Sequence, residues 1–256
     1  MNRNPPPEVK QELRAEVGFG CPVPGCGNPY LEWHHFDPPW NEENHHDPAR
    51  MIALCGPHHK KADNKGAFTN DQLRKFKAQG RQSWMKIKGK FDWMRNSLLV
   101  MAGGAFYYKI PVIFQYYDEP IIWFERNEEE YLLLNVKMLS TTEPARLLIR
   151  NNEWFANGNE IDIVSPPSGK SLDVKYPNGD YFAIKFLEIS DSAEFRKEYP
   201  KISIDLRLIN FPITGVNITY DIADTKISFT PAETKLEGFK LSGGFISDSP
   251  VGISIG

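Results

Sequence analysis

The sequence predicts an α+β protein of two domains: a small zinc-bound unit of strands and helices, then an all-β, sandwich-like domain. Three observations support this. All three cysteines and all six histidines of the 256 residues lie between Cys21 and His59. Residues 1–104 hold 15 basic and 11 acidic residues, a balance of +4, whereas residues 105–256 hold 15 and 22, a balance of −7. Beyond residue 104 the chain becomes a series of short apolar segments separated by turns.

The composition indicates a globular protein, because 41% hydrophobic residues supply a core without a disulfide framework. An odd number of cysteines argues against paired bridges and favours a reducing compartment. No apolar run approaches the ~20 residues that span a bilayer, and the first twenty residues lack the apolar segment of a signal peptide. We therefore expect a cytoplasmic protein with no membrane partner.

The spacing of the cysteines predicts a metal site. Cys21 and Cys26 flank a turn rich in proline and glycine, which directs both sulfur atoms to one centre. After 28 residues Cys55 and His58 follow as a second close pair, which completes a Cys3His set. Thiolate and imidazole together favour Zn²⁺. The competing interpretation is that these are buried free cysteines, which is the common state of isolated intracellular cysteines.

The local pattern around the cysteines predicts two strands and a helix. Residues 8–16 have helix-forming composition, and residues 30–35 have strand-like composition. A polar loop then leads to the apolar run 51–54, and Gly56-Pro57 begins a helix with proline near its first turn. A ββα unit this small needs support beyond its own core, so we expect the zinc to be structural.

Two segments, LEWHHFDP at 31–38 and MIALCGPHHKKAD at 51–63, together with the upstream cysteines, resemble the HNH endonucleases of the ββα-metal class. The resemblance covers about residues 10–80. It implies an enzyme that hydrolyses DNA phosphodiester bonds. It also implies that His34 and His59 bind a catalytic divalent ion, Mg²⁺ or Mn²⁺, and that His35 is the general base that activates water.

The residue types suit that chemistry. A histidine with its ordinary pKa of about 6.5 can accept a proton near neutral pH. Neighbouring residues of a strand point to opposite faces, so His34 and His35 are expected to have different roles. One position departs from the family pattern, because Arg50 stands where the family has asparagine. Either Arg50 contacts phosphate, or Asn44 takes over the bracing of the loop.

The two remaining histidines, His45 and His46, have two interpretations. They are loop ligands or phosphate contacts, or they are solvated loop residues. Of the two, we include His46 among the candidate phosphate contacts.

A basic segment follows the motif. Residues 74–95 contain eight Lys or Arg and one acid, which indicates a face that contacts DNA phosphates, with Arg74, Lys77 and Arg81 as candidates. A solvated helix face is the alternative. Apolar residues recur at helical spacing and predict a helical connector over residues 81–104, either a dimer seam or a surface that packs on the second domain. They are Trp84, Ile87, Phe91, Met94, Leu98 and Met101.

Residues 105–256 predict about ten short strands. The segment 201–209 alternates apolar and polar residues and predicts a strand. Proline and glycine clusters at 166–169 and 177–180 indicate turns. The region contains no cysteine or histidine, so we expect a module for partner recognition, DNA positioning or oligomerisation.

Two functions are compatible with these observations. The first is a metal-dependent DNA endonuclease of HNH type built on residues 1–80. A further interpretation makes this nuclease the effector of a phage or bacterial defence system in which the β-rich residues 105–256 are the functional part. The second is a non-catalytic zinc-binding module that docks on DNA or protein. A protein partner or a second copy of the chain would bind through residues 84–101 or through the β-rich domain.

Overall fold

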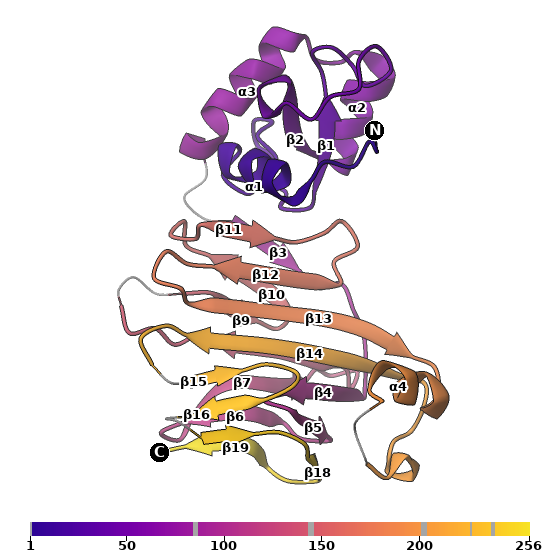
Figure 1. Ribbon diagram of the computed structural model, residues 1–256, viewed down its shortest axis with the longest axis vertical. Coiled ribbons are helices and arrows are strands. Elements are labelled where there is room, and N and C mark those ends of the chain that lie inside the picture. Colours follow the sequence, from indigo (N-terminus) through magenta and orange to yellow (C-terminus); the bar gives the residue numbers. More distant parts are fainter. Residues whose placement is uncertain (1, 84–86, 143–145, 201–203, 226, 237–238) are drawn as a thin grey trace.

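The structure is a computed structural model that describes residues 2–83, 87–142, 146–200, 204–225, 227–236 and 239–256. Figure 1 shows a small N-terminal unit of helices and a two-stranded sheet, which stands at one end of a β-sandwich formed by the rest of the chain. The predicted combination of a mixed N-terminal unit and a β-rich second domain is confirmed at this level.

The N-terminal unit contains the predicted strand–strand–helix order. Strands β1 and β2 pair antiparallel, with Leu31 opposite Cys55 and His35 opposite Met51. Helix α2 begins with Pro57 in its first turn, and Gly66 in the left-handed conformation, with φ of 50°, ends it. The elements are α1 (Pro7–Glu16), β1 (Leu31–His35), β2 (Met51–Cys55), α2 (Gly56–Lys65) and α3 (Asn70–Ser83).

Strand β2 is the centre of this unit, because every one of its five residues is buried. Helix α2 packs against both strands and α1 packs against β2. Leu13 of α1 and Leu73 of α3 belong to the same apolar cluster. A strand covered from both sides reads as a continuous apolar run, as Met51–Cys55 does.

Two sheets form the sandwich. The first has the order β19-β6-β7-β8-β9-β10-β3. Its strands are β3 (Ile87–Lys90), β6 (Val112–Tyr116), β7 (Glu119–Arg126), β8 (Leu132–Lys137), β9 (Leu148–Arg150), β10 (Glu153–Ala156) and β19 (Val251–Ile255).

The second sheet has the order β11-β12-β13-β14-β15-β16-β17, with β4 beside β14, β5 beside β4 and β18 beside β5. Its strands are β4 (Leu98–Ala102), β5 (Ala105–Tyr108), β11 (Asp162–Val164), β12 (Ser171–Lys175), β13 (Tyr181–Ile189), β14 (Ile213–Ile222), β15 (Ile227–Phe229), β16 (Thr234–Leu236), β17 (Phe239–Leu241) and β18 (Phe245–Ser247).

The two sheets share one aromatic core. Phe114 of the first sheet packs its ring 4.8 Å from Phe229 and 5.8 Å from Tyr220 of the second, measured between ring centroids. Trp154 and Phe182 are completely buried in the same cluster. Large aromatic rings in offset and edge-on contact fill the roughly 10 Å between two sheets.

The predicted helical connector over 81–104 is wrong for the described residues. Helix α3 ends at Ser83, and β3 and β4 occupy residues 87–90 and 98–102. Gly89 shows the reason, because a Cβ added there would lie 2.5 Å from the ring of Trp154, so this segment is held flat against β10. The stripe residues Ile87, Phe91, Leu98 and Met101 are buried inside the chain and Met94 is exposed, while Trp84 lies outside the described residues.

The predicted strand over 201–209 is also wrong. Residues 201–203 lie outside the described residues, and Leu206–Leu208 form a turn of 3₁₀ helix. Asp205 begins that turn, because its carboxylate accepts the amide proton of Arg207. Helix α4 (Ser192–Glu198) precedes this segment and was not predicted, although Asp191 caps it through the amides of Ala193 and Glu194.

A buried ion pair joins the N-terminal unit to the sandwich. Arg14 of α1 donates from Nε and Nη2 to the two carboxylate oxygens of Asp162 in β11, at 2.9 and 2.7 Å. Both side chains are at least nine-tenths buried. Close by, the Tyr30 hydroxyl accepts a hydrogen bond from the Lys90 amide at 3.0 Å. Polar groups buried from water at this junction are therefore satisfied across it.

A second buried pair lies within the sandwich. Arg146 Nε donates to Asp180 at 2.8 Å, and both side chains are almost completely buried. The guanidinium lies 4.4 Å from the centroid of the Tyr176 ring, and Asp180 also accepts from Ser140 and from the Ala223 amide. Burial by itself would raise the pKa of Asp180, but these hydrogen bonds outweigh it and hold the pKa below its ordinary value.

In the described part of the chain, no helix combines the length and the apolar character needed to cross a membrane.

Replacing Asp162 by alanine should destabilise the protein by about 3–5 kcal/mol, because Arg14 would keep a buried charge without its partner. The double variant Arg14→Met with Asp162→Leu should recover most of that loss, since it removes both charges. Urea unfolding measures both. If the double variant is no more stable than Asp162→Ala, the junction is not organised by this pair.

The depressed pKa of Asp180 predicts a stabilising contribution that is present above the unfolded pKa, about 3.9, and is lost as the pH falls through the lower folded value. Asp180→Asn should therefore unfold at lower urea concentration than the original chain at pH 7. The difference between their urea midpoints should become smaller as the pH falls from about 5 to about 2. A gap that stays constant over that range would contradict the assignment.

Candidate metal centres

The four residues of the predicted Cys3His set come together in the N-terminal unit. Cys21 and Cys26 lie in the loop between α1 and β1, Cys55 ends β2, and His58 lies in the first turn of α2. The loop folds as a tight knuckle because the Gly27 amide donates to the Cys21 carbonyl, and Gly25 and Gly27 take positive φ angles of 78° and 63°. Only glycine adopts such angles without strain.

The distances within this set fit a tetrahedral ion. Cys26 Sγ and Cys55 Sγ are 3.7 Å apart, and His58 Nδ1 lies 3.4 Å from Cys21 Sγ and 3.2 Å from Cys55 Sγ. Two thiolates bound to tetrahedral zinc at about 2.3 Å stand about 3.8 Å apart. The three cysteines form no disulfide. The geometry is therefore that of a four-ligand group able to bind a metal ion such as zinc.

The protonation of the thiols depends on a cation. Burial raises the pKa of Cys21 and of Cys55, and it lowers the pKa of His58. Without a compensating charge, thiols in this position stay protonated. A divalent ion is the compensating charge that holds buried thiolates, and it makes folding and metal binding one process.

A second cluster lies on the other side of the same helix. His34 of β1 and His59 and Asp63 of α2 each offer one ligand atom, and these atoms lie within 4.8 Å of one another. His34 Nδ1 is 2.9 Å and His59 Nε2 is 3.4 Å from the Asp63 carboxylate. Burial lowers the pKa of His34, which keeps its ring neutral and able to donate a lone pair, although the Asp63 charge opposes that shift.

Asp63 and Glu32 are the members of this cluster that sequence reasoning missed. Asp63 lies four residues after His59, and residues at that spacing share a helix face. Glu32 lies two residues before His34 and shares its strand face. Its carboxylate lies 2.9 Å from His59 Nδ1, and the opposite ring nitrogen, Nε2, is turned toward Asp63. Both spacings were visible in the sequence.

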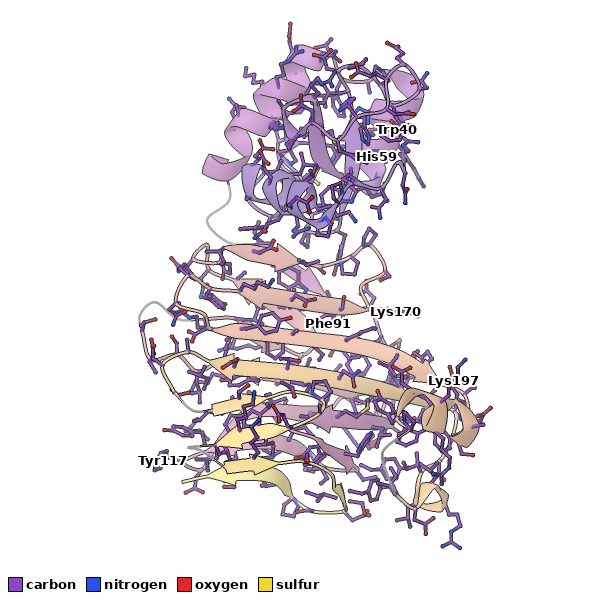
Figure 2. The ribbon with its side chains drawn as sticks, viewed as in Figure 1. Trp40, His59, Phe91, Tyr117, Lys170 and Lys197 are labelled. Carbon is purple, nitrogen blue, oxygen red and sulfur yellow. The ribbon has the colours of Figure 1, made fainter. Side chains whose placement is uncertain are left out.

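His58 and His59 face different clusters, as the sequence predicted. Consecutive helical residues are turned by about 100°, so His58 reaches the cysteines while His59 reaches His34. The two groups therefore share one turn of α2 without sharing a ligand. Figure 2 shows where His59 and Trp40 lie on the N-terminal unit, above the sandwich.

His35 points away from His34, toward the loop that joins the two strands. Its ring centroid lies 4.7 Å from Trp40, 5.2 Å from His45 and 5.8 Å from His46. The side chain is 3% exposed, and neither ring nitrogen forms a hydrogen bond within the described residues. Burial first, and then the charges that His45 and His46 can carry, lower the pKa of His35 to about 4.

Of the remaining loop histidines, His45 is buried and His46 is half-buried, and both form hydrogen bonds within the chain. His45 is buried, accepts the Asp47 amide proton at Nδ1 and donates from Nε2 to the Pro38 carbonyl at 3.0 Å. His46 donates from Nε2 to the Asn2 carbonyl at 2.9 Å and stacks on Trp40 with ring centroids 5.3 Å apart. Both residues therefore hold the loop together, a role that neither sequence interpretation included.

The candidate phosphate contacts are engaged within the chain. Arg50 donates to Glu43 and Asp47, and Arg74 to Asp37 and Asp71. Lys77 contacts the carbonyls of Pro48 and Met51 and lies 2.9 Å from the Glu16 carboxylate, which occupies its three donors. The side chain of Arg81 lies outside the described residues.

Asn44 forms one hydrogen bond within the loop between the strands, because its Nδ2 donates to the Trp40 carbonyl at 2.8 Å. Its bracing role stays a prediction. The phosphate contacts also stay predictions, for Arg50, His46, Arg74, Lys77 and Arg81.

Comparison with known proteins gives no further support. No family model matches the chain, and no significant match exists among the curated proteins or the solved structures. The resemblance to HNH endonucleases therefore rests on the sequence motifs alone and stays a prediction.

Replacing Cys55 by alanine should remove the bound metal and unfold the N-terminal unit, because a structural zinc supplies about 10 kcal/mol or more of folding free energy. Metal analysis and thermal unfolding measure the two effects. His59→Ala is the matched control, since His59 neighbours His58 but faces the other cluster, and it should retain zinc. An unchanged melting profile for Cys55→Ala would refute the four-ligand assignment.

Proposed function

We propose that the protein is a metal-dependent endonuclease that hydrolyses DNA phosphodiester bonds. The observation that carries the proposal is the convergence of His34, His59 and Asp63 on one face of a ββα unit. Two histidines and one carboxylate leave about half of the coordination positions of an octahedral divalent ion open for phosphate and water. A purely structural site closes all four positions, as the Cys3His group does.

The side chains have separate roles in this proposal. His34, His59 and Asp63 hold the ion, and Glu32 keeps the ring of His59 in the orientation that ligation needs. His35 accepts the proton of the attacking water, a task for which histidine is the usual residue. A bound divalent ion supplies a counter-charge for the phosphate oxygens.

The ligand types bear on the choice of ion. Mg²⁺ prefers oxygen ligands, whereas imidazole suits softer divalent ions and carboxylate suits both. A site of two imidazoles and one carboxylate therefore favours Mn²⁺ over Mg²⁺. We propose that Mn²⁺ supports higher activity at equal concentration.

The surface charge near the cluster supports a nucleic-acid substrate. Lys60 and Lys61 follow His59 directly on α2. Both are exposed, and neither forms an ion pair within the described residues. Unpaired lysines next to a metal cluster attract a phosphate backbone, and the attraction weakens with salt.

One observation favours the alternative function, a non-catalytic zinc module that docks on DNA or protein. His35 is covered by the loop between the strands and has no access to solvent in this arrangement. The alternative predicts one zinc per chain and no affinity for a second divalent ion. The endonuclease predicts a second, exchangeable ion at His34, His59 and Asp63.

His35→Ala should lower the rate of plasmid cleavage about 100-fold or more, because it removes the general base, while Mn²⁺ binding is retained. Asp63→Ala should weaken Mn²⁺ binding and lower cleavage as a consequence. Glu42→Gln removes the charge of an exposed carboxylate that lies outside the cluster and forms no ion pair within the described residues, and it should change neither. Plasmid nicking with Mn²⁺ and calorimetric Mn²⁺ titration are the measurements, and equal cleavage by His35→Ala would exclude the mechanism.

A further inference from the structure

The loop of residues 36–50, which we name the cover loop, lies over His35. Trp40 lies against the His35 ring on one side, and His45 and His46 lie near it on others. Trp40 is itself only partly buried and stacks on His46 at an interplanar angle of 23°. The cover is therefore one layer of rings between His35 and solvent.

The tip of the cover loop is tied together as one piece. Asn44 donates to the Trp40 carbonyl, His45 donates to the Pro38 carbonyl, and the Asp47 amide donates to the His45 ring. These bonds join residues within the loop. They would persist if the loop tip moved away from His35, whereas the bond from His46 to the Asn2 carbonyl would have to break.

Arg50, at the end of the cover loop where β2 begins, joins the loop tip to the rest of the unit, together with the contact of His46 with Asn2 and the ion pair of Arg74 with Asp37. Its Nη1 and Nη2 donate to the two Glu43 carboxylate oxygens at 3.1 and 2.9 Å, and its Nε donates to Asp47 at 3.1 Å. Arg50 directly precedes the buried strand β2, so its backbone is fixed while Glu43 lies on the loop. All three side chains are between one-third and about half exposed, so the ion pair can open in water.

The same donors suit a phosphate. A guanidinium binds a carboxylate and a phosphodiester through the same bidentate fork. Glu43 therefore occupies the side of Arg50 that a DNA phosphate would take. The departure from asparagine at this position of the HNH pattern becomes explicable, because asparagine has no charge to exchange between a carboxylate and a phosphate.

We propose that the cover loop is a substrate-opened lid: Arg50 holds it closed over His35 through Glu43 and Asp47, and a DNA phosphate opens it by taking the guanidinium. Only the opening of the loop by a DNA phosphate rests on the proposed nuclease function. The closed latch is a property of the chain without DNA. Arg50 is in this sense a positioning residue, which controls access to His35.

The latch is tested without DNA. Glu43→Gln keeps the shape of the side chain and removes its charge, and Glu42→Gln makes the same change at a neighbouring exposed residue that forms no ion pair within the described residues. Two measurements report opening of the loop. The first is acrylamide quenching of Trp40 fluorescence, which is obtained by subtracting the signal of a Trp40→Phe chain. The second is modification of His35 by diethyl pyrocarbonate. Glu43→Gln should raise both rates about two- to fivefold, the range open to an exposed ion pair, and Glu42→Gln should raise neither.

The exchange of Arg50 is tested by cleavage at limiting plasmid with Mn²⁺. Glu43→Gln should raise kcat/KM by a similar factor, about two- to fivefold, since opening no longer competes with the latch. Arg50→Ala should open the loop in the quenching assay as Glu43→Gln does, yet show no gain in kcat/KM, because the phosphate contact is lost. If Arg50 had only a structural role, Arg50→Ala and Glu43→Gln would change kcat/KM in the same direction.

The outcomes separate the two proposals. If acrylamide quenches Trp40 fluorescence equally in the Glu43→Gln and Glu42→Gln variants, the lid is refuted whatever the cleavage results are. If Arg50→Ala gains as much kcat/KM as Glu43→Gln, the exchange with phosphate is refuted. If Glu43→Gln opens the loop and no variant cuts DNA with Mn²⁺, the latch is upheld, while the nuclease function and the exchange with phosphate both fall.

Discussion

The pairing of β1 with β2 is the constraint on which the N-terminal unit depends. Its register sets His34 opposite Ile52 and places Cys55 at the end of β2, where α2 begins. Because α2 starts immediately, His58 and His59 are carried back over the sheet, one toward the cysteines and one toward His34. A slip of one residue in this pairing would exchange the faces of His34 and His35 and dismantle the second cluster.

The division between a closed and an open metal group follows from the same arrangement. The Cys3His group draws its ligands from the knuckle, the end of β2 and the start of α2, so it fixes the three segments that must meet. The second group uses side chains that those segments then bring together. A metal ion bound at the first group would thus organise the geometry of the second, and the Arg14–Asp162 pair joins this unit to the sandwich.

Much of the N-terminal unit was predictable because its signals are local. The cysteine spacing, the alternation of His34 and His35 and the proline that begins α2 each act within a few residues. The connector was not predictable, since Ile87, Phe91 and Leu98 have helical spacing and only Trp154, sixty-odd residues away in sequence, holds Gly89 flat. The ion pair of Lys77 was not predictable for a related reason: its partner Glu16 lies on another helix, and no pattern near Lys77 reveals it.

The adjacency of His58 and His59 has a consequence for how this chain can vary. An insertion of one residue between them would turn His59 by about 100° and carry it off the face that it shares with Asp63. A substitution of His58 or of His59 affects only the group to which that residue belongs. A change in the spacing between them displaces one of the two residues from its group even when the other stays in place. The dipeptide therefore tolerates no change in length, and the two metal groups can only be inherited as a single unit.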